Sequence, residues 1–102
     1  MSNMESVAKK ADIPVGSGKT VQIDGKPVAI FNVEGSFYAI DDTCLHRGGA
    51  LGEGTLEGSI VTCPRHGWQY DVKTGVNTTN PEVKIKAYEV KIDGEDVLVS
   101  LG

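Results

Sequence analysis

The chain has 102 residues, of which 39% are hydrophobic and 24% charged, and its formal net charge is −4. This length supports one hydrophobic core and excludes a multi-domain enzyme, while the acidic balance without a basic stripe argues against a nucleic-acid partner. Because no apolar run approaches the roughly 20 residues that cross a bilayer, and residues 1–10 lack the features of a secretion signal, we expect a cytoplasmic protein with no membrane partner.

The composition favours strands over helices. Val and Ile together number 19 against five Leu, and 13 glycines punctuate the chain at short intervals. No window keeps a 3.6-residue apolar period over three turns, so any helix should be short and peripheral. The sequence therefore predicts an all-β fold.

A hairpin is predicted in the first third of the chain. Residues 19–24 alternate polar and apolar side chains, Asp24-Gly25 supplies a tight turn, and residues 26–33 return as a longer strand. A further turn then leads into a third strand at residues 37–40.

A second hairpin is predicted at the end of the chain. Val83, Ile85 and Ala87 alternate with polar residues and are expected to share one face of a strand. Asp93-Gly94 then turns the chain into a last strand, whose apolar side chains are Val97, Val99 and Leu101.

The middle of the chain has a different composition. Residues 43–58 contain five glycines and few bulky apolar side chains, too few for a central strand. A long loop in a compact domain is usually functional or held by something other than packing. We expect an ordered functional loop here, held by a bound metal.

Every cysteine and histidine of the chain falls into one pattern. Cys44-Leu45-His46 is followed, after 16 residues, by Cys63-Pro64-Arg65-His66-Gly67-Trp68, so that each segment offers one thiolate and one imidazole. Two cysteines are too few for the disulfide framework of a small secreted protein. The alternative is four unrelated residues, with buried thiols and hydrogen-bonded imidazoles, but the paired spacing favours one shared metal site.

Two kinds of metal centre compete for these ligands. Zinc accepts two cysteines and two histidines, although its usual spacing pairs Cys with Cys and His with His. A 2Fe-2S cluster with two cysteines on one iron and two histidines on the other uses the interleaved order, because each segment then grips both irons. We prefer the cluster and keep a Cys2His2 zinc module as the alternative.

The spacing Cys-x-His, 16 residues, Cys-x-x-His-Gly-Trp resembles the ligand signature of the Rieske family. The resemblance continues through Gln69-Tyr70-Asp71 and Lys73-Thr74-Gly75 and covers nearly the whole chain. It implies one Rieske domain over residues 1–102, with stacked antiparallel sheets and a cluster-binding subdomain formed by two loops, at residues 43–52 and 62–70.

The resemblance also implies one [2Fe-2S] cluster and its surroundings. Cys44 and Cys63 would bind the inner iron, and His46 and His66 the outer iron near solvent. Trp68 would either cover the cluster or anchor a docked partner, and Pro81 would stiffen a third loop over it. The residues expected around the ligands are Arg47, Gly48, Gly49, Arg65, Gly67, Trp68, Tyr70 and Pro81.

Four positions bear on the reduction potential that the resemblance implies. High-potential relatives carry a disulfide where this chain has Gly49 and Arg65, and a sulfide-bonding serine where it has Trp68. Tyr70 matches a tyrosine that donates to a cysteine sulfur. Because one hydrogen-bond donor is missing, we expect a midpoint in the lower part of the family range, roughly −150 to 0 mV.

The function implied is one-electron transfer by a Rieske-type ferredoxin. Its expected partners are a flavin-dependent NAD(P)H reductase and a terminal oxygenase, met by a monomer in brief electrostatic encounters. An oxygenase is excluded because its mononuclear iron needs two further histidines, and we expect no catalytic residue. A carrier for another redox enzyme, such as a nitrite reductase system, is kept as an alternative.

Overall fold

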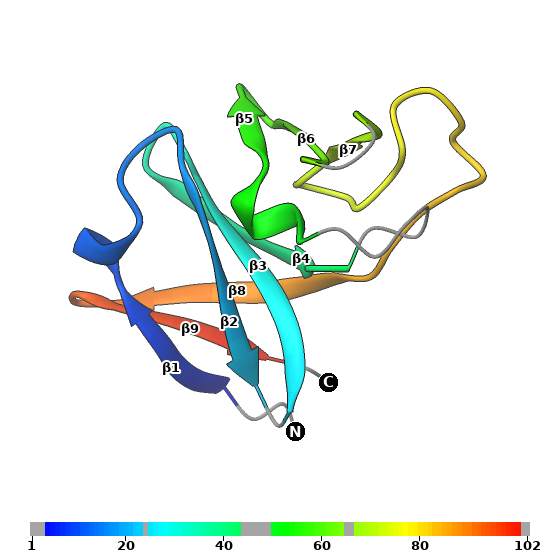
Figure 1. The fold of residues 1–102 in the computed structure, drawn as a ribbon. Helices are drawn as coiled ribbons and strands as arrows, with labels where there is room; N and C mark the ends of the chain where they lie inside the picture. Colours follow the sequence, from blue (N-terminus) through cyan, green and yellow to red (C-terminus); the bar gives the residue numbers. More distant parts are fainter. Residues whose placement is uncertain (1–3, 24, 44–49, 65–66, 101–102) are drawn as a thin grey trace.

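The computed structural model describes residues 4–23, 25–43, 50–64 and 67–100. In this part of the chain, all regular structure is strand apart from two short 3-10 helices, η1 (Lys10–Asp12) and η2 (Leu51–Glu53). The strands form a six-stranded sheet and a three-stranded sheet, both antiparallel (Figure 1). The predicted all-β fold is confirmed.

The larger sheet has the order β1-β9-β8-β4-β3-β2. Its strands are β1 (Met4–Lys9), β2 (Gly18–Ile23), β3 (Lys26–Val33), β4 (Ser36–Asp41), β8 (Ala87–Asp93) and β9 (Asp96–Ser100). The smaller sheet has the order β5-β6-β7, with β5 (Thr55–Glu57), β6 (Ile60–Thr62) and β7 (Gln69–Asp71).

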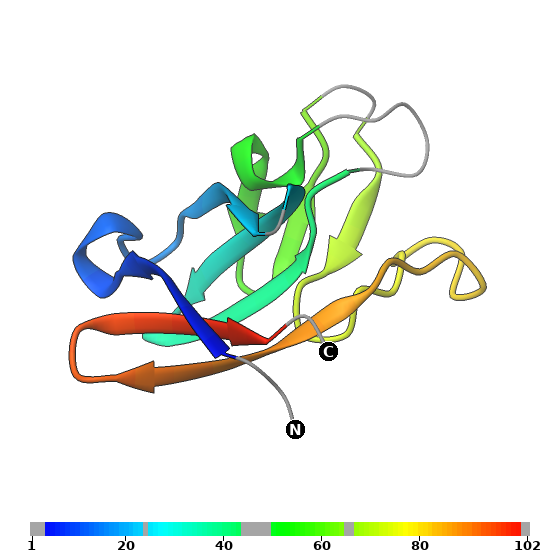
Figure 2. The same ribbon diagram turned by 90° about the horizontal axis from the view of Figure 1, so that it is seen from below.

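The structure stacks in layers, with β2, β3 and β4 in the middle (Figure 2). One side of this middle layer faces β8, β9 and β1, which continue the same sheet through a short pairing of Ala39 with Tyr88 and Ile40 with Ala87. The other side faces the smaller sheet. The middle layer therefore separates two hydrophobic cores.

Alternation along β3 assigns its side chains to these two cores, because successive residues of a strand point to opposite faces. Val28 and Ile30 point into the sheet core, which is made of Ile13, Val21, Ile23, Val28, Ile30, Phe37, Ala39, Tyr88, Val97 and Val99. Ala29, Phe31 and Val33 point into the loop-side core, which is made of Ala29, Phe31, Val33, Ile40, Leu51, Val61, Cys63, Tyr70, Val72 and Ile85.

The first predicted hairpin is confirmed. β2 pairs with β3 from Gly18 opposite Phe31 to Ile23 opposite Lys26. Gly25 in the turn has φ +78°, a left-handed conformation that glycine adopts at little cost. The predicted third strand is β4, which pairs with the other edge of β3.

The second hairpin is confirmed in place but wrong in one detail. β8 and β9 pair around a turn in which Asp93 lies opposite Asp96. However, Ala87 is exposed and does not share the buried face of Ile85. The strand begins only at Ala87, and its buried residue Tyr88 packs in the sheet core, whereas Ile85 belongs to the loop-side core.

The sequence analysis did not predict four of the strands. β5, β6 and β7 have three residues each, too few to show a period of two. β1 is an edge strand whose pairing with β9 shifts between Ser6 and Ala8, which breaks its alternation. β5 lies within residues 43–58 at an edge of its sheet, and the described part of this region, residues 43 and 50–58, supplies no central strand.

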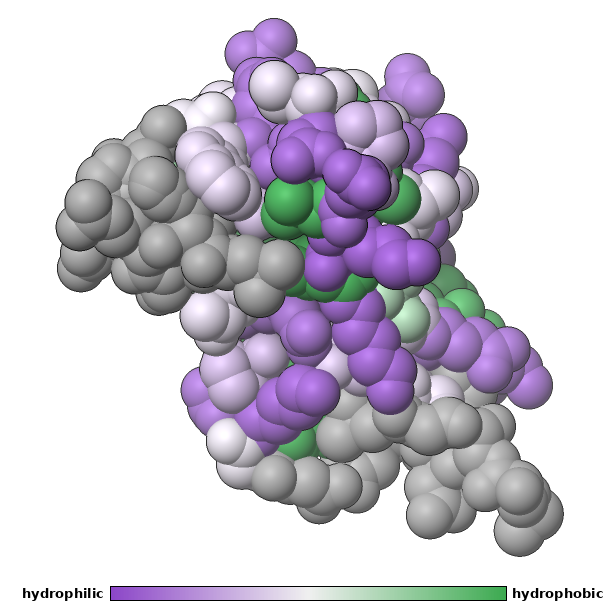
Figure 3. Space-filling model, turned by 90° about the vertical axis from the view of Figure 1, so that its right-hand side faces the viewer, coloured by the Kyte–Doolittle hydropathy of each residue, from purple (hydrophilic) through white to green (hydrophobic). Residues whose placement is uncertain are grey.

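The visible surface is largely hydrophilic. In Figure 3, apolar side chains appear on the coloured part of one face only as small areas between polar ones. Within the described ranges, no helix is long and apolar enough to cross a membrane.

Candidate metal centre

Residues at the ends of both predicted ligand loops pack in the loop-side core. Leu51 lies near the end of the first loop, and Cys63 and Tyr70 lie near the two ends of the second. All three belong to the loop-side core. Leu51 and Tyr70 are fully buried, and Cys63 is 2% exposed. Packing on the side of β3 and β4 that faces the smaller sheet therefore brings the bases of both loops together.

The first loop is closed at its base by main-chain hydrogen bonds. Thr43 and Ala50 form an isolated antiparallel bridge. One step outward, the Leu51 N–H donates to the Asp42 carbonyl oxygen over 2.7 Å. The described residues on either side of this segment, Thr43 and Ala50, are thus neighbours in the structure.

The Asp42 side chain adds a second set of contacts to this base. Its Oδ1 accepts hydrogen bonds from the Gly52 N–H and from the Thr20 hydroxyl, each 2.8 Å long. Asp42 is 4% exposed, so these contacts lie away from water. They tie the loop to β2, which is a neighbour in space but not in sequence.

The second loop leaves the smaller sheet at Cys63, directly after β6. The Cys63 N–H donates to the Trp68 carbonyl oxygen over 2.7 Å, and the Gly67 N–H donates to the Cys63 carbonyl oxygen over 3.1 Å. Gly67 has φ +75° with open space around its Cα, so it serves the turn conformation rather than a close approach to a described neighbour. The loop therefore returns at once to β7.

A third loop, residues 76–86, lies against the second. The Thr78 N–H donates to the Gln69 carbonyl oxygen over 3.0 Å, and Asn77 forms an isolated bridge with Tyr70. The buried Asn77 Oδ1 accepts from the N–H groups of Thr79 and Asn80, both over 2.9 Å. The Asn77 side chain therefore fixes the backbone of the polar segment 77–80, which has no apolar side chains to hold it by packing.

Pro81 sits in a tight turn of this third loop. The Val83 N–H donates to the Asn80 carbonyl oxygen over 2.9 Å, which puts Pro81 at the second position of a β-turn, where its fixed φ fits best. This agrees with the stiffening expected of it, while a position over the cluster stays a prediction.

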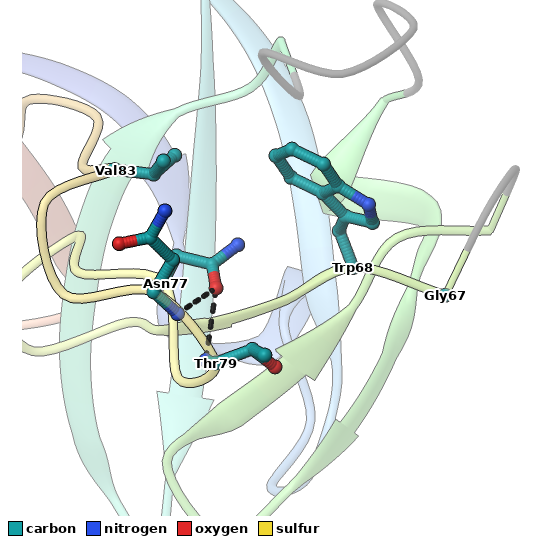
Figure 4. A pocket seen from close by; sticks show the side chains of 6 residues that line it. Gly67, Trp68, Asn77, Thr79 and Val83 are labelled. Atoms are coloured by element: carbon teal, nitrogen blue, oxygen red, sulfur yellow. Dashed lines mark hydrogen bonds between the residues drawn. The ribbon is translucent and has the colours of Figure 1, made fainter.

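A cavity of about 230 Å³ lies between parts of the second loop and the third. It is lined by Gly67, Trp68, Asn77, Thr79, Asn80 and Val83. In Figure 4 the Trp68 ring lies on one side of it, and Asn77 and Val83 lie on the other. Trp68 is half-buried and packs against the loop-side core. Its packing accounts for its burial, and a docking role stays a prediction.

A charged group lies beside the base of the first loop. The Tyr88 hydroxyl donates to Asp41 Oδ1, and the Lys26 Nζ lies 3.7 Å from the same oxygen. Burial, and then the hydrogen bond to Asp41, raise the pKa of Tyr88 above its ordinary value. The Tyr88 hydroxyl and the Asp41 carboxylate raise the pKa of Lys26, so this lysine stays charged at neutral pH.

Of the four predicted ligands, Cys63 alone lies within the described residues; Cys44, His46 and His66 lie outside them. Among the neighbours expected around the cluster, Gly67, Trp68, Tyr70 and Pro81 are described. Those outside are Arg47, Gly48, Gly49 and Arg65.

The described residues fit an iron–sulfur cluster. Cys63 is a free, buried thiol at the base of a loop, and thiolates are the ligands that iron–sulfur clusters prefer. The bases of the two loops share one core, as a centre bridging both loops requires.

Sequence reasoning missed the residues that hold the loops. Asp42, Thr20 and Asn77 are polar, and only their contacts show their roles. An Asn two or three residues before another turn-forming residue is a recognisable turn signal, so Asn77 could have been found. The Thr20–Asp42 contact joins residues 22 positions apart and leaves no local pattern.

Comparisons with known proteins agree with this site. Residues 3–97 match the family of the Rieske [2Fe-2S] domain. The ferredoxin component of the naphthalene 1,2-dioxygenase system of Pseudomonas aeruginosa is 40% identical over 91 residues, which cover 88% of each chain.

Two solved structures are similar over nearly their whole length. The ferredoxin of carbazole 1,9a-dioxygenase from Nocardioides aromaticivorans IC177 has a TM-score of 0.88 and 31% identity, covering 96% of this chain and 97% of that one. A chain in a complex of reduced oxygenase and oxidized ferredoxin in carbazole 1,9a-dioxygenase has a TM-score of 0.86 and 33% identity, covering 95% and 92%. The chain therefore belongs to the Rieske [2Fe-2S] domain family and carries one 2Fe-2S cluster of the Rieske type.

Proposed function

We propose that this chain is the ferredoxin component of a ring-hydroxylating dioxygenase system, carrying single electrons from a flavin-dependent NAD(P)H reductase to a terminal oxygenase. The observation that carries the proposal is the buried Cys63 thiol on the core that also supports the first loop. Relatives named as ferredoxin components of such systems match over most of the chain, and they are electron carriers rather than catalysts.

The proposal assigns the cluster ligands by sequence position. Cys44 and His46 on a loop at residues 43–52, and Cys63 and His66 on a loop at residues 62–70, hold the two irons within one domain over residues 1–102. The Thr43–Ala50 bridge and the hydrogen bond between Cys63 and Trp68 support this assignment, because main-chain contacts join the described residues on either side of each proposed ligand segment.

The cluster, when bound, supplies one-electron redox chemistry at a potential that histidine ligation raises above that of four-cysteine clusters. The chain's own residues supply the setting. Cys63 would bind iron from a buried position, and Trp68 packs against the same core as this cysteine. Hydrogen bonds at the loop bases restrict movement of the ligands, which keeps the geometry similar in both oxidation states.

The proposed partners meet the chain transiently. One similar structure contains a ferredoxin in complex with the oxygenase of its system, which supports a terminal oxygenase as acceptor. A reductase as donor is inferred from the role of a carrier, which must be reduced before it can reduce its partner. The net charge of −4 favours brief contacts with basic surfaces.

Reconstituted electron transfer tests the proposal. The chain is purified with its cluster, mixed with an NADH-dependent flavoprotein reductase and a terminal oxygenase from a dioxygenase system, and product is measured with the chain present, absent, or replaced by Cys63→Ser. Product that depends on the intact chain supports the proposal. Equal product in all three mixtures, although the oxygenase is active with a chemical reductant, contradicts it.

A further inference from the structure

We infer that Asp42 is a positioning residue for the cluster, and that it acts through the Thr20 hydroxyl and the Gly52 N–H to fix the loop that carries Cys44 and His46. The inference rests on the proposed function, because it concerns how this chain holds its redox centre. It goes beyond the ligand set, since neither Thr20 nor Asp42 is a ligand.

Asp42 uses its main chain and its side chain at the same point. Its carbonyl oxygen accepts from Leu51 over 2.7 Å, and its N–H donates to the Pro27 carbonyl oxygen over 3.3 Å. Its Oδ1 accepts from Gly52 and from Thr20, both over 2.8 Å. One buried residue therefore joins both ends of the first loop to β2 and to the start of β3.

The site has no spare room for a different arrangement. A Cβ atom on Gly52 would lie 2.3 Å from the Thr20 Oγ1 and 2.8 Å from the Thr20 N. Gly52 thus lets its N–H reach Asp42 while η2 lies directly against β2. Close packing of backbone on backbone gives the loop base one defined position.

A buried carboxyl group is costly unless its oxygens are hydrogen-bonded. Asp42 is 4% exposed, and its neighbour Asp41 is more exposed and serves the separate contact with Tyr88. The two adjacent aspartates therefore have different roles. Removing the Thr20 hydroxyl leaves the Asp42 oxygen with one donor fewer. The loop base is then less firmly fixed to β2 at a point two residues before Cys44.

The test compares Thr20→Val, which keeps the shape but removes the donor, with Thr20→Ser, which keeps a hydroxyl. Asp42→Asn keeps an acceptor oxygen for both donors, and Asp42→Ala removes it. Thr55→Val, at an exposed position of β5, is the matched control for the change from Thr to Val.

Two properties of the cluster-loaded proteins are measured: the electron paramagnetic resonance spectrum after reduction, and the rate of cluster loss at a temperature where the wild-type fold is intact. Thr20→Val and Asp42→Ala are expected to broaden and shift the g values. They are also expected to speed cluster loss by about tenfold, the effect of leaving buried hydrogen-bonding groups at the loop base without a partner. Thr20→Ser, Asp42→Asn and Thr55→Val should stay within about twofold of wild type on that scale.

A purely structural role gives a different result, because it lowers the unfolding temperature and leaves the g values unchanged. Wild-type spectra in Thr20→Val and Asp42→Ala, or equal cluster loss in Thr20→Val and Thr20→Ser, overturn the inference. If Asp42→Ala does not fold, the Thr20 pair still decides, since Val suits a strand position. Failure of the proposed function is distinguishable: the wild-type protein itself then fails to pass electrons to the oxygenase, whatever the variants show.

Discussion

The N–H of Cys63 donates to the carbonyl oxygen of Trp68 over 2.7 Å, so the buried thiol proposed as an iron ligand is joined directly to a residue five positions further along the chain. His66 lies between them in the sequence, on a stretch of four residues closed by this contact. This hydrogen bond restricts the backbone at Cys63, and an ordered ligand is what a redox centre requires.

Cys63→Ser should abolish the cluster. Serine keeps the size of the side chain but replaces the soft thiolate that iron–sulfur clusters require. The visible absorbance of the purified protein, together with its iron and sulfide content, measures the loss. Far-UV circular dichroism is the control for folding. A variant that keeps a full complement of iron and sulfide would remove Cys63 from the ligand set.

Trp68→Ser should raise the midpoint potential, and Trp68→Ala should not raise it in the same way. The resemblance places a sulfide-bonding serine at this position in high-potential relatives, so the new hydroxyl restores a missing donor. One hydrogen bond is worth a shift on the order of 50 mV for a one-electron couple. Protein film voltammetry of both variants measures it, and equal potentials in the two variants would show that the hydroxyl does not reach the cluster.

Electron transfer to the oxygenase should slow as salt is added. The chain carries a net charge of −4, and the screening length falls from about 10 Å at 0.1 M salt to about 3 Å at 1 M. Stopped-flow rates across this range give the dependence. Glu53→Gln, directly after the first loop, should reduce the rate at low salt more than Glu89→Gln on β8. Rates that do not change with salt would exclude electrostatic attraction as the driving force.

Tyr88 should make the fold sensitive to alkaline pH. Burial and the hydrogen bond to Asp41 raise its pKa above the ordinary value of 10.0, so the folded state keeps the phenol proton where the unfolded state loses it. Its contribution to the free energy of unfolding is full below pH 10.0 and decreases as pH rises through the raised pKa.

Urea unfolding of wild type and Tyr88→Phe at pH 8 and at roughly pH 11 checks this contribution. The stability advantage of the wild type over Tyr88→Phe should shrink between the two pH values. An advantage that stays constant, or grows, contradicts the assigned direction of the shift.

Gly75→Ala should destabilise the third loop more than Gly25→Ala destabilises its hairpin. Both glycines have a positive φ, +81° and +78°, and the left-handed conformation costs alanine about 1–2 kcal/mol at either site. At Gly75 a Cβ would also lie 2.1 Å from the Ile85 carbonyl oxygen, while Gly25 has open space. Such overpacking adds about 1–3 kcal/mol. Equal unfolding free energies for the two variants would show that the third loop shifts to make room for the added Cβ atom.

Much of the fold could be predicted because its signals are local. The β2–β3 hairpin follows from alternation on both sides of an Asp-Gly turn, and the two strands pair around that turn. The ligand pattern is readable because the chain has only two cysteines and two histidines, all within two short segments.

The rest could not be predicted because it depends on contacts between distant segments. The three-residue strands of the smaller sheet exist through their pairing and not through their own sequence. The exposure of Ala87 depends on where β8 begins against β4. The role of Asp42 depends on Thr20, which reaches it from another strand.

The proposed electron transfer requires two irons bridged by sulfide between the two loops, and electron paramagnetic resonance of the reduced protein detects such a centre. We predict a rhombic signal whose average g value is lower than that of four-cysteine 2Fe-2S clusters, in a red-brown protein with equal amounts of iron and acid-labile sulfide. A colourless protein that contains zinc, or a signal of the four-cysteine type, would contradict it.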